Sequence, residues 1–352
     1  MTVTEKIPIW LDCDPGNDDV FAILLSTFNQ NFNLIGISTV HGNAPLSMTT
    51  HNTLALLDIL NVYHIKVYQG SETPLIKPSH FAPQIHGSNG IGGVKFPKDT
   101  INQLCYDVNY LQAMKQAILN YNHKLCLICT GPLTNVSKLF TTYPELTSKV
   151  NLISIMGGGL NIGNVTPYAE FNFFADPDAA DNVLSLTGVK INLAPLNLTH
   201  KVIATKEIRN KIFNKSLTSK NSKFRKIFYN ILNFFSESYK IKYGITEGPP
   251  IHDPVALFSI LPFLDTENEN EDYNYQYIRK KLRVITDGDH QGESIIDEDE
   301  SSDTEDGIYI GQNINVNKFW NELLQCIDIA EKYNKLSLKA DLNPTFASTT
   351  FY

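Results

Sequence analysis

Short apolar runs alternate with longer amphipathic stretches along most of the chain. In the amphipathic stretches apolar residues recur at three- and four-residue spacing, as at Val20, Ile23 and Leu24, which predicts helices. Apolar runs that alternate with helices are typical of an open α/β fold, in which helices cover both faces of a mostly parallel sheet. The predicted strands are Ile7–Leu11, Leu34–Val40, Lys66–Tyr68, Leu125–Cys129, Leu152–Met156 and Ile191–Pro195.

The same pattern predicts the domain organisation. A closing amphipathic helix over Val316–Tyr333 favours a single domain over residues 1–335 and a tail over residues 336–352. Residues 287–307 break the pattern because they are rich in Asp and Glu. We expect this insertion to be a solvated loop or hairpin tip that the chemistry does not need. A calcium loop is the alternative interpretation, but the ligand spacing of an EF-hand is missing.

Composition and charge exclude several classes of protein. The chain has 352 residues, of which 42% are hydrophobic, and a formal net charge of −8. This balance lacks the basic footprint of a nucleic-acid binder, and no apolar run approaches the length of about 18 residues that spans a bilayer. The five cysteines are scattered, and Cys126 and Cys129 lie inside an apolar strand. We therefore expect buried thiols, a cytoplasmic location, and neither a nucleic-acid nor a membrane partner.

The strongest chemical signal follows the first predicted strand. The segment Asp12–Asp19 reads DCDPGNDD, so four carboxylates lie within eight positions. Such carboxylates repel one another unless protons or a cation neutralise them, and hard divalent cations prefer oxygen ligands. Helix capping by Asp18 or Asp19 explains one or two of the four. A phosphatase of the haloacid-dehalogenase type also begins with Asp-x-Asp, but its pattern has no role for the second Asp pair. The segment predicts a divalent-cation site.

A glycine-rich loop follows the predicted strand that ends at Met156. The dinucleotide fingerprint does not fit it, because Ile162 stands where the third glycine belongs and Pro167 blocks a helix. A turn-rich surface loop is one interpretation. A loop that presents amides and a carboxylate to the hydroxyl groups of a sugar is the other, and its side chains would be Asn164, Glu170 and Asn172.

A third cluster enters a helix predicted over Val255–Leu261. Pro249 and Pro250 fix the approach to His252 and Asp253. Asp253 alone predicts a helix cap. Beside a cation site, however, Asp253 becomes a candidate ligand and His252 a candidate acid.

Together these blocks resemble the nucleoside hydrolase family of the inosine-uridine preferring type, and within it the fungal uridine-hydrolysing branch. The resemblance spans Ile7 to Tyr333. Many blocks in the same order make it far more specific than any one block. The matching blocks are Asp12–Asp19, Gly42–Asn43, Thr130–Asn135, Met156–Gly159, Asn164 with Glu170–Asn172, and His252–Pro254.

The resemblance implies a calcium (Ca²⁺) ion held by Asp14, Asp19, Asp253 and the backbone carbonyl of Thr130. It implies that Asp14 is also the base that activates a water molecule, and that His252 lies near the leaving base. Such an enzyme would hydrolyse the N-glycosidic bond of a ribonucleoside, with uridine as the favoured substrate. The resemblance further implies a homodimer or homotetramer.

The resemblance also assigns the substrate contacts. Asp18 and Asn172 would hold the 2′- and 3′-hydroxyls with Asn43 close by, while Asn164 and Glu170 would hold the 5′-hydroxyl. The base pocket would be formed by His86, Met156, Tyr239 and Tyr243. His252 argues against the purine-specific branch, whereas Asn17 stands where pyrimidine-preferring relatives often carry His. The alternatives are a broader hydrolase that acts on inosine, cytidine or nicotinamide riboside, and a nucleoside- or ribose-binding protein without catalysis.

Overall fold

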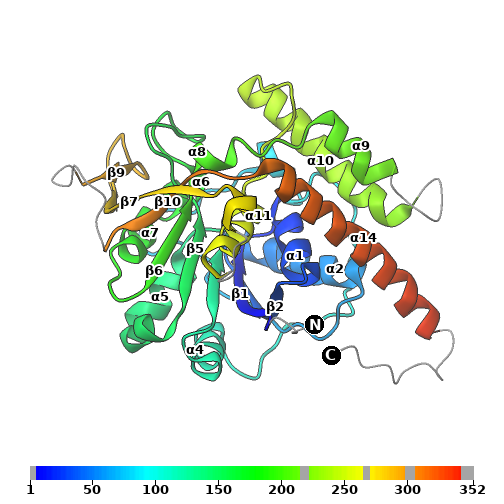
Figure 1. The fold of residues 1–352 in the computed structure, drawn as a ribbon, viewed down its shortest axis with the longest axis horizontal. Coiled ribbons are helices and arrows are strands. Elements are labelled where there is room, and N and C mark those ends of the chain that lie inside the picture. Colours follow the sequence, from blue (N-terminus) through cyan, green and yellow to red (C-terminus); the bar gives the residue numbers. More distant parts are fainter. Residues whose placement is uncertain (1–4, 215–221, 265–269, 298–305, 342–352) are drawn as a thin grey trace.

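The computed structural model describes residues 5–214, 222–264, 270–297 and 306–341 (Figure 1). Its main sheet has the order β3-β2-β1-β4-β5-β6-β10-β7. All neighbouring strands run parallel except β7, which pairs antiparallel with β10. The predicted α/β fold is thereby confirmed. The strands of this sheet are β1 (Ile7–Cys13), β2 (Phe32–Thr39), β3 (Val67–Gln69), β4 (Cys126–Cys129), β5 (Leu152–Met156), β6 (Lys190–Ala194), β7 (Gln276–Lys280) and β10 (Ile308–Asn313).

Helices connect the strands, and a two-stranded antiparallel ribbon, β8 (Leu282–Val284) and β9 (Ser294–Ile296), lies outside the main sheet. The helices are α1 (Asp19–Phe28), α2 (Leu46–Leu60), α3 (Pro83–His86), α4 (Tyr110–Tyr121), α5 (Thr134–Thr142), the 3₁₀ helix Pro144–Lys149, α6 (Phe171–Ala175), α7 (Pro177–Leu184), α8 (Leu196–Thr199), α9 (Lys206–Asn214), α10 (Lys223–Tyr243), α11 (Asp253–Phe258), α12 (Leu261–Leu264), α13 (Asn270–Tyr273) and α14 (Val316–Asp341).

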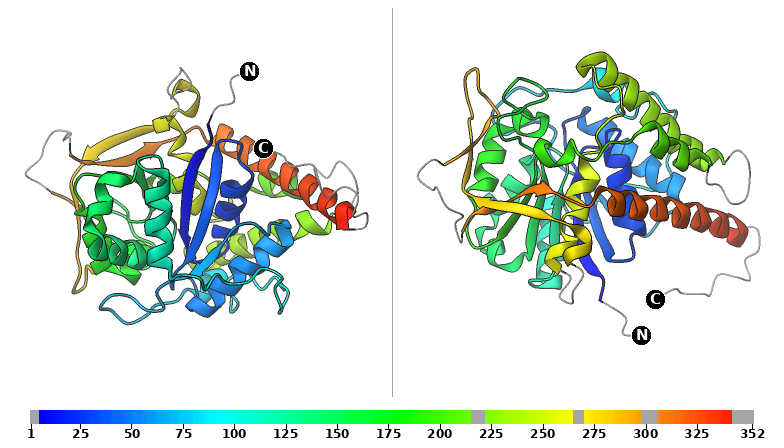
Figure 2. Two further views of the ribbon diagram at one scale, coloured as in Figure 1. Left: turned by 90° about the horizontal axis from the view of Figure 1, so that it is seen from below. Right: turned by 45° about the horizontal axis from the view of Figure 1, so that its top comes forward.

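The helices form two layers, one on each face of the sheet (Figures 1 and 2). Apolar side chains of α1, α10, α11 and α14 pack with one face of β1 into the larger core. Side chains of α4, α5 and α7 pack with the opposite face into a second core. Because both faces of β1, β2, β4, β5 and β6 are largely buried, these inner strands are mostly apolar, which is why their positions can be predicted from the sequence.

The strand order reverses direction at β1. The chain builds outward from β1 through β2 to β3, and then returns to the other side of β1 with β4. In open α/β sheets, ligands bind at such a switch point, beyond the carboxyl ends of the strands. Asp14 follows β1 and Thr130 follows β4, so both lie at this point.

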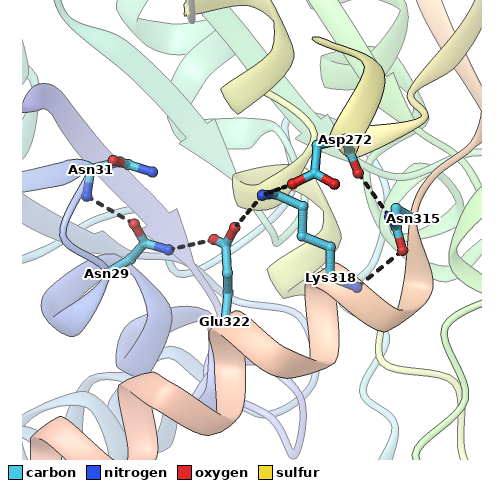
Figure 3. A network of polar contacts seen from close by, with 6 residues as sticks. All are labelled: Asn29, Asn31, Asp272, Asn315, Lys318 and Glu322. Carbon is cyan, nitrogen blue, oxygen red and sulfur yellow. Dashed lines mark hydrogen bonds and ion pairs between the residues drawn. The ribbon is translucent and has the colours of Figure 1, made fainter. Parts of the chain in front are cut away.

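A network of polar contacts attaches the closing helix α14 to two distant parts of the chain (Figure 3). Glu322 of α14 accepts a hydrogen bond of 2.9 Å from Asn29, at the end of α1. Lys318, one turn earlier, pairs with Asp272 of α13 at 2.7 Å. Two half-buried side chains one turn apart on α14 therefore connect it to α1 and to α13.

Two predictions about organisation need correction. The closing helix continues to Asp341, so residues 336–341 are helical and do not belong to an irregular tail. The acidic insertion is only partly a solvated loop, because it contains β9, and Ser294 is buried. Residues 298–305 and 342–352 lie outside the described residues, and the assignment of residues 1–335 to one domain stays a prediction.

Two further expectations concern the state of the cysteines and the presence of membrane-spanning segments. Cys126 and Cys129 are fully buried, as predicted, and all five cysteines are free thiols. No helix within the described ranges is long and apolar enough to cross a membrane.

Candidate active site

A cavity of about 200 Å³ opens at the carboxyl ends of the central strands. Its walls come from the strand-end loops on one side and from α3 and α10 on the other. The structure thus brings together residues that lie more than two hundred positions apart in the chain. The predicted site residues that line it are Asp18, Asn43, His86, Thr130, Met156, Asn164, Glu170, Asn172, Tyr239, Tyr243, His252 and Asp253.

Three carboxylates meet at the floor of the site; Asp18 and Asp253 line the cavity, whereas Asp19, like Asp14, is buried and does not line it. One oxygen each of Asp18, Asp19 and Asp253 lies within 4.8 Å of the others, and all three residues are buried. Asp18 occupies the N-cap position of α1, and Asp253 begins α11, but neither helix start carries a side-chain capping bond. Helix capping therefore does not account for these acids.

Asp14 lies beside this cluster and is fully buried. Its Oδ2 accepts a hydrogen bond of 2.7 Å from the backbone N–H of Asn43, whereas its Oδ1 has no hydrogen-bond partner. A Cβ added at Gly131 would lie 2.7 Å from this Oδ1, and one added at Gly42 would clash with Oδ2. The two glycines leave the space that the carboxylate occupies, and one of its oxygens remains available to a ligand.

Burial and mutual repulsion dominate the electrostatics of these acids. Burial raises the pKa of Asp14 and of Asp253 well above the usual value, and repulsion from neighbouring aspartates adds to it. The pKa of Asp18 rises to about 7 for the same reasons. Without a cation the cluster therefore retains protons near neutral pH. The donor set is purely oxygen, one buried oxygen lacks a partner, and the charges lack compensation, so these residues fit a hard divalent cation.

Asp12 does not belong to the cluster, although the sequence places it in the same acidic segment. Side chains alternate along β1, so Asp12 projects to the face opposite Leu11 and Cys13. There its Oδ1 accepts hydrogen bonds from Ser38 and from Asn135. Of the four carboxylates in the segment, three face the cavity floor and one supports the other side of the sheet.

Thr130 links the acidic cluster to the glycine-rich loop. Its hydroxyl donates to Asp19 Oδ1 at 2.9 Å, and its carbonyl accepts a hydrogen bond of 2.9 Å from the Asn172 amide. Asn172 also donates to the carbonyl of Met156, at 3.2 Å. The carbonyl predicted as a metal ligand and the amide predicted to hold ribose are thus in direct contact.

Glu170 has a structural role that sequence reasoning missed. It is the N-cap of α6, and its carboxylate accepts backbone hydrogen bonds from Gly158, Asn172 and Phe173. Burial raises its pKa to about 7. Asn164 lies on the same loop, and its buried Oδ1 has no partner. Glu170 therefore shapes the loop, and Asn164 keeps a free acceptor at the cavity.

His252 is held between two hydroxyl groups. Its Nδ1 is hydrogen-bonded to Thr199 at 2.8 Å and its Nε2 to the Tyr239 hydroxyl at 2.7 Å. Burial, with His200 and His86 nearby, lowers the pKa of His252 well below its usual value. The imidazole is therefore neutral at pH 7, and which nitrogen carries the proton is set by the two hydroxyls.

The wall from α3 and α10 contains residues that sequence reasoning missed. The missed residues are Phe235 and Lys242 of α10, which line the cavity together with the predicted Tyr239 and His86. The ring of His86 lies 5.7 Å from that of Phe235. Asn17, where a histidine was noted in relatives, does not line the cavity. Its backbone N–H instead donates to His86 Nδ1 at 3.0 Å. Phe235, Tyr239 and Lys242 recur at helical spacing, which indicates that they share one face of a helix. An amphipathic helix that packs on the core has the same spacing, so the spacing does not identify residues of the cavity.

The β8–β9 hairpin contacts the outside of the glycine-rich loop. Glu293 bridges to Ala169 and Ser294 to Leu160, and Gln291 donates to the carbonyl of Phe174 at 3.2 Å. The ring of His290 stacks on Tyr168 with centroids 3.9 Å apart. This part of the acidic insertion therefore contacts the loop that carries Asn164. The expectation that the chemistry does not need the insertion stays a prediction.

Comparisons with known proteins agree with this geometry. The family model for inosine-uridine preferring nucleoside hydrolase matches residues 9–321. The chain is 40% identical to a uridine nucleosidase of Saccharomyces cerevisiae, over 96% of this chain and 100% of the relative. It is 35% identical to a pyrimidine-specific ribonucleoside hydrolase RihA of Escherichia coli, over 72% of this chain and 79% of the relative.

A solved structure shows the same similarity in three dimensions. The structure of a purine-preferring ribonucleoside hydrolase from Gardnerella vaginalis superposes with a TM-score of 0.81 at 27% identity, covering 94% of this chain and 99% of that one. The comparisons of sequence and of fold thus agree on the family. The chain belongs to the inosine-uridine preferring nucleoside hydrolases, a family of N-glycosyl hydrolases.

Proposed function

We propose that the protein hydrolyses the N-glycosidic bond of uridine, giving ribose and uracil, in a reaction that depends on calcium. The observation that carries the proposal is the buried acidic cluster at the cavity floor, with one unpartnered oxygen on Asp14. The named similarity to a uridine nucleosidase over the whole length supports uridine as the substrate.

The ligands of the ion would be Asp14, Asp19, Asp253 and the carbonyl of Thr130. Asp18 belongs to the group of three close carboxylates and is therefore a further candidate. A bound calcium ion would neutralise the carboxylates and lower the pKa of a water molecule that it holds.

Asp14 is the residue best placed to accept a proton from the attacking water. Its Oδ1 is buried and has no hydrogen-bond partner, so it could accept a proton once a bound cation keeps the carboxylate ionised. As the bond to the base breaks, positive charge develops on the ribosyl ring, in an oxocarbenium-like transition state. The carboxylates of Asp18 and Asp253 stabilise that charge from the floor of the cavity.

The leaving base departs on the opposite side, towards α10. The hydrogen-bonded pair of Tyr239 and His252 lines this side of the cavity. Because the imidazole is neutral, we assign to the pair a hydrogen bond and no net proton transfer: His252 Nε2–H donates to the Tyr239 oxygen, and the Tyr239 hydroxyl donates to the leaving base. Asn172, Asn43 and Asn164 offer amides to the ribose hydroxyls, with Asn164 Oδ1 unoccupied by the protein itself.

A panel of nucleosides tests the proposal. The purified protein is incubated with uridine, cytidine, inosine and nicotinamide riboside, with calcium or with a chelator, and released ribose is measured. We expect the highest kcat/KM for uridine and its loss with chelator. Equal rates with chelator would reject the calcium dependence, and a protein that binds uridine without releasing ribose would be the catalytically inactive alternative.

We also propose a homodimer or homotetramer in a reducing, cytoplasmic compartment. The free state of all five cysteines supports a reducing environment. Light scattering on the purified protein measures the subunit number, and a monomer at micromolar concentration would contradict it.

A further inference from the structure

Lys242 is a cation at the wall of the cavity that the mechanism above does not use. It lines the cavity although the residue as a whole is exposed, and its ammonium lies over the ring of Tyr243, which also lines the cavity, 5.0 Å from the ring centroid. Phe235, Tyr239 and Lys242 stand at positions i, i+4 and i+7 of α10, which places them on one face of the helix. Lys242 therefore continues the stripe that faces the cavity.

A neighbouring lysine shows the contrast. Lys240 lies on the same last turn of α10, its side chain is 56% exposed, and it pairs with Glu237 at 3.7 Å. It does not line the cavity. The two lysines thus share a helix end and differ in the direction they face.

The surroundings of Lys242 place it on the base side of the cavity. Burial, with the charge of Lys242 as the smaller cause, lowers the pKa of His86 on the α3 wall, and partial burial lowers the pKa of Lys242 itself. The acids and amides that suit ribose come from the opposite wall, at the strand ends. A nucleoside whose ribose lies on those groups directs its base towards Phe235, Tyr239 and Lys242.

An ammonium group has three donors and no acceptor. The outer edge of uracil carries a carbonyl at C4 and that of hypoxanthine a carbonyl at C6, and both accept hydrogen bonds. Cytosine and adenine carry an amino group at the same positions, which is a donor. A site built around a donor discriminates against a ligand that presents another donor. The ammonium charge also stabilises negative charge that a departing oxo base develops.

We propose that Lys242 is a specificity-determining residue that selects nucleosides with an oxo base, such as uridine and inosine, over those with an amino base, such as cytidine and adenosine. This rests on the proposed function, since it concerns the base that the hydrolase releases.

The test compares two pairs of substrates on four proteins in the presence of calcium. The proteins are the unaltered chain, Lys242→Met, Lys242→Arg and, as a matched control, Lys240→Met. We expect Lys242→Met to lower the ratio of kcat/KM for uridine over cytidine by about tenfold or more, through loss on uridine. The inosine-to-adenosine ratio should fall likewise. Lys242→Arg keeps a donor and should retain most of the preference, and Lys240→Met should leave both ratios unchanged.

The outcomes separate this inference from the proposed function. An unaltered chain that hydrolyses none of the four nucleosides would overturn the proposed function and this inference with it. An active chain whose ratios stay the same in Lys242→Met, or fall equally in Lys240→Met, would overturn the role of Lys242 alone. A loss of the same factor on all four substrates would also reject selectivity and indicate a general effect on binding.

Discussion

Asp12 and Asp14 stand two positions apart, yet the fold gives them different surroundings. Asp12 still belongs to β1 and projects into the layer of Ser38 and Asn135, whereas Asp14 lies beyond the strand at the cavity floor. The sequence alone shows four equivalent acids. Side chains alternate in direction along β1, and the strand ends at Cys13. These two facts separate Asp12, a structural acid, from the three candidates for function that follow the strand.

The first prediction at this scale concerns Asp14. Asp14→Asn keeps the size of the side chain but removes the base and one charged ligand. We expect kcat for uridine to fall by about 10²–10⁴-fold, the range of general-base catalysis. Asp12→Asn is the matched control, because it makes the same chemical change on the other face of the sheet. A variant at Asp14 with near-normal kcat and only a raised KM would contradict the assignment.

A second prediction concerns the leaving group. His252→Ala and Tyr239→Phe should each lower kcat/KM for inosine more than for a nitrophenyl riboside, because nitrophenolate leaves without a hydrogen bond from the pair. General-acid help amounts to about 10²–10⁴-fold and sets the upper limit for this hydrogen bond, so the contrast between the two substrates should be measurable. Equal losses on both would show that the pair only braces Asp253 and the cavity wall.

The third prediction is a pH dependence of stability that originates at Asp12. Burial raises its pKa to about 7, against about 4 in the unfolded chain. Between these values the folded protein keeps a proton that the unfolded chain has released, so the free energy of unfolding falls as pH rises from 4 to 7. The full effect is of the order of 4 kcal/mol. Urea denaturation of the calcium-free protein at pH 5 and pH 8 should show a smaller difference in Asp12→Asn than in the unaltered chain.

At the scale of elements, the sequence best predicts the strands that are buried on both faces. The inner strands β1, β2, β4, β5 and β6 have apolar runs that reveal them within one or two residues. β10 is also an inner strand, but it is not predicted, because its sequence, IYIGQN, ends in polar, half-buried residues. β7 is not predicted, because it is an edge strand whose sequence, QYIRK, is exposed or half-buried. β9 lies within the acidic run, where charge density indicates solvent. Its pairing with β8 and its contacts with the glycine-rich loop depend on residues far away in the chain.

The hairpin between β8 and β9 gives the prediction at this scale. A Cβ added at Gly292 would lie 2.6 Å from Phe174 Cα, and Phe174 lines the cavity. Gly292→Ala should therefore raise KM for uridine several-fold by displacing the loop. Gly288→Ala is the matched control, since Gly288 has nearly the same positive φ, of +81° against +84°, with nothing within 4 Å of an added Cβ. The test is the steady-state KM for uridine of both variants. Equal KM values would show that the hairpin does not affect substrate binding at the site.

At the scale of the whole molecule, the site joins parts of the sequence that are predictable to different degrees. The strand-end motifs around Asp14, Asn172 and Asp253 are local, so the sequence identifies them. The wall from α10 is not predictable, because the face that a helix turns to a cavity depends on how it packs. Phe235 and Lys242 were missed for this reason, and Tyr239 was identified only through the resemblance.

The prediction at this scale is that calcium stabilises the fold in a pH-dependent way. The acids of the cavity floor hold protons when their pKa values are raised, and calcium must displace those protons. Added calcium should therefore raise the Tm more at pH 8 than at pH 5, and a chelator should reverse the rise. Calorimetry with and without calcium at both pH values measures this. An equal rise in Tm at both pH values would indicate that calcium binds somewhere other than these carboxylates.

The position of Asp253 in the chain has a consequence for synthesis. Asp14 and Asp253 are separated by 253 − 14 = 239 positions, and the ribosome releases the first long before the second. Domains generally fold as units. A chain that has emerged only as far as β4 therefore holds the acids of the first loop without their last partner. On the proposed function, the cation site is then completed late in synthesis, once Asp253 has emerged.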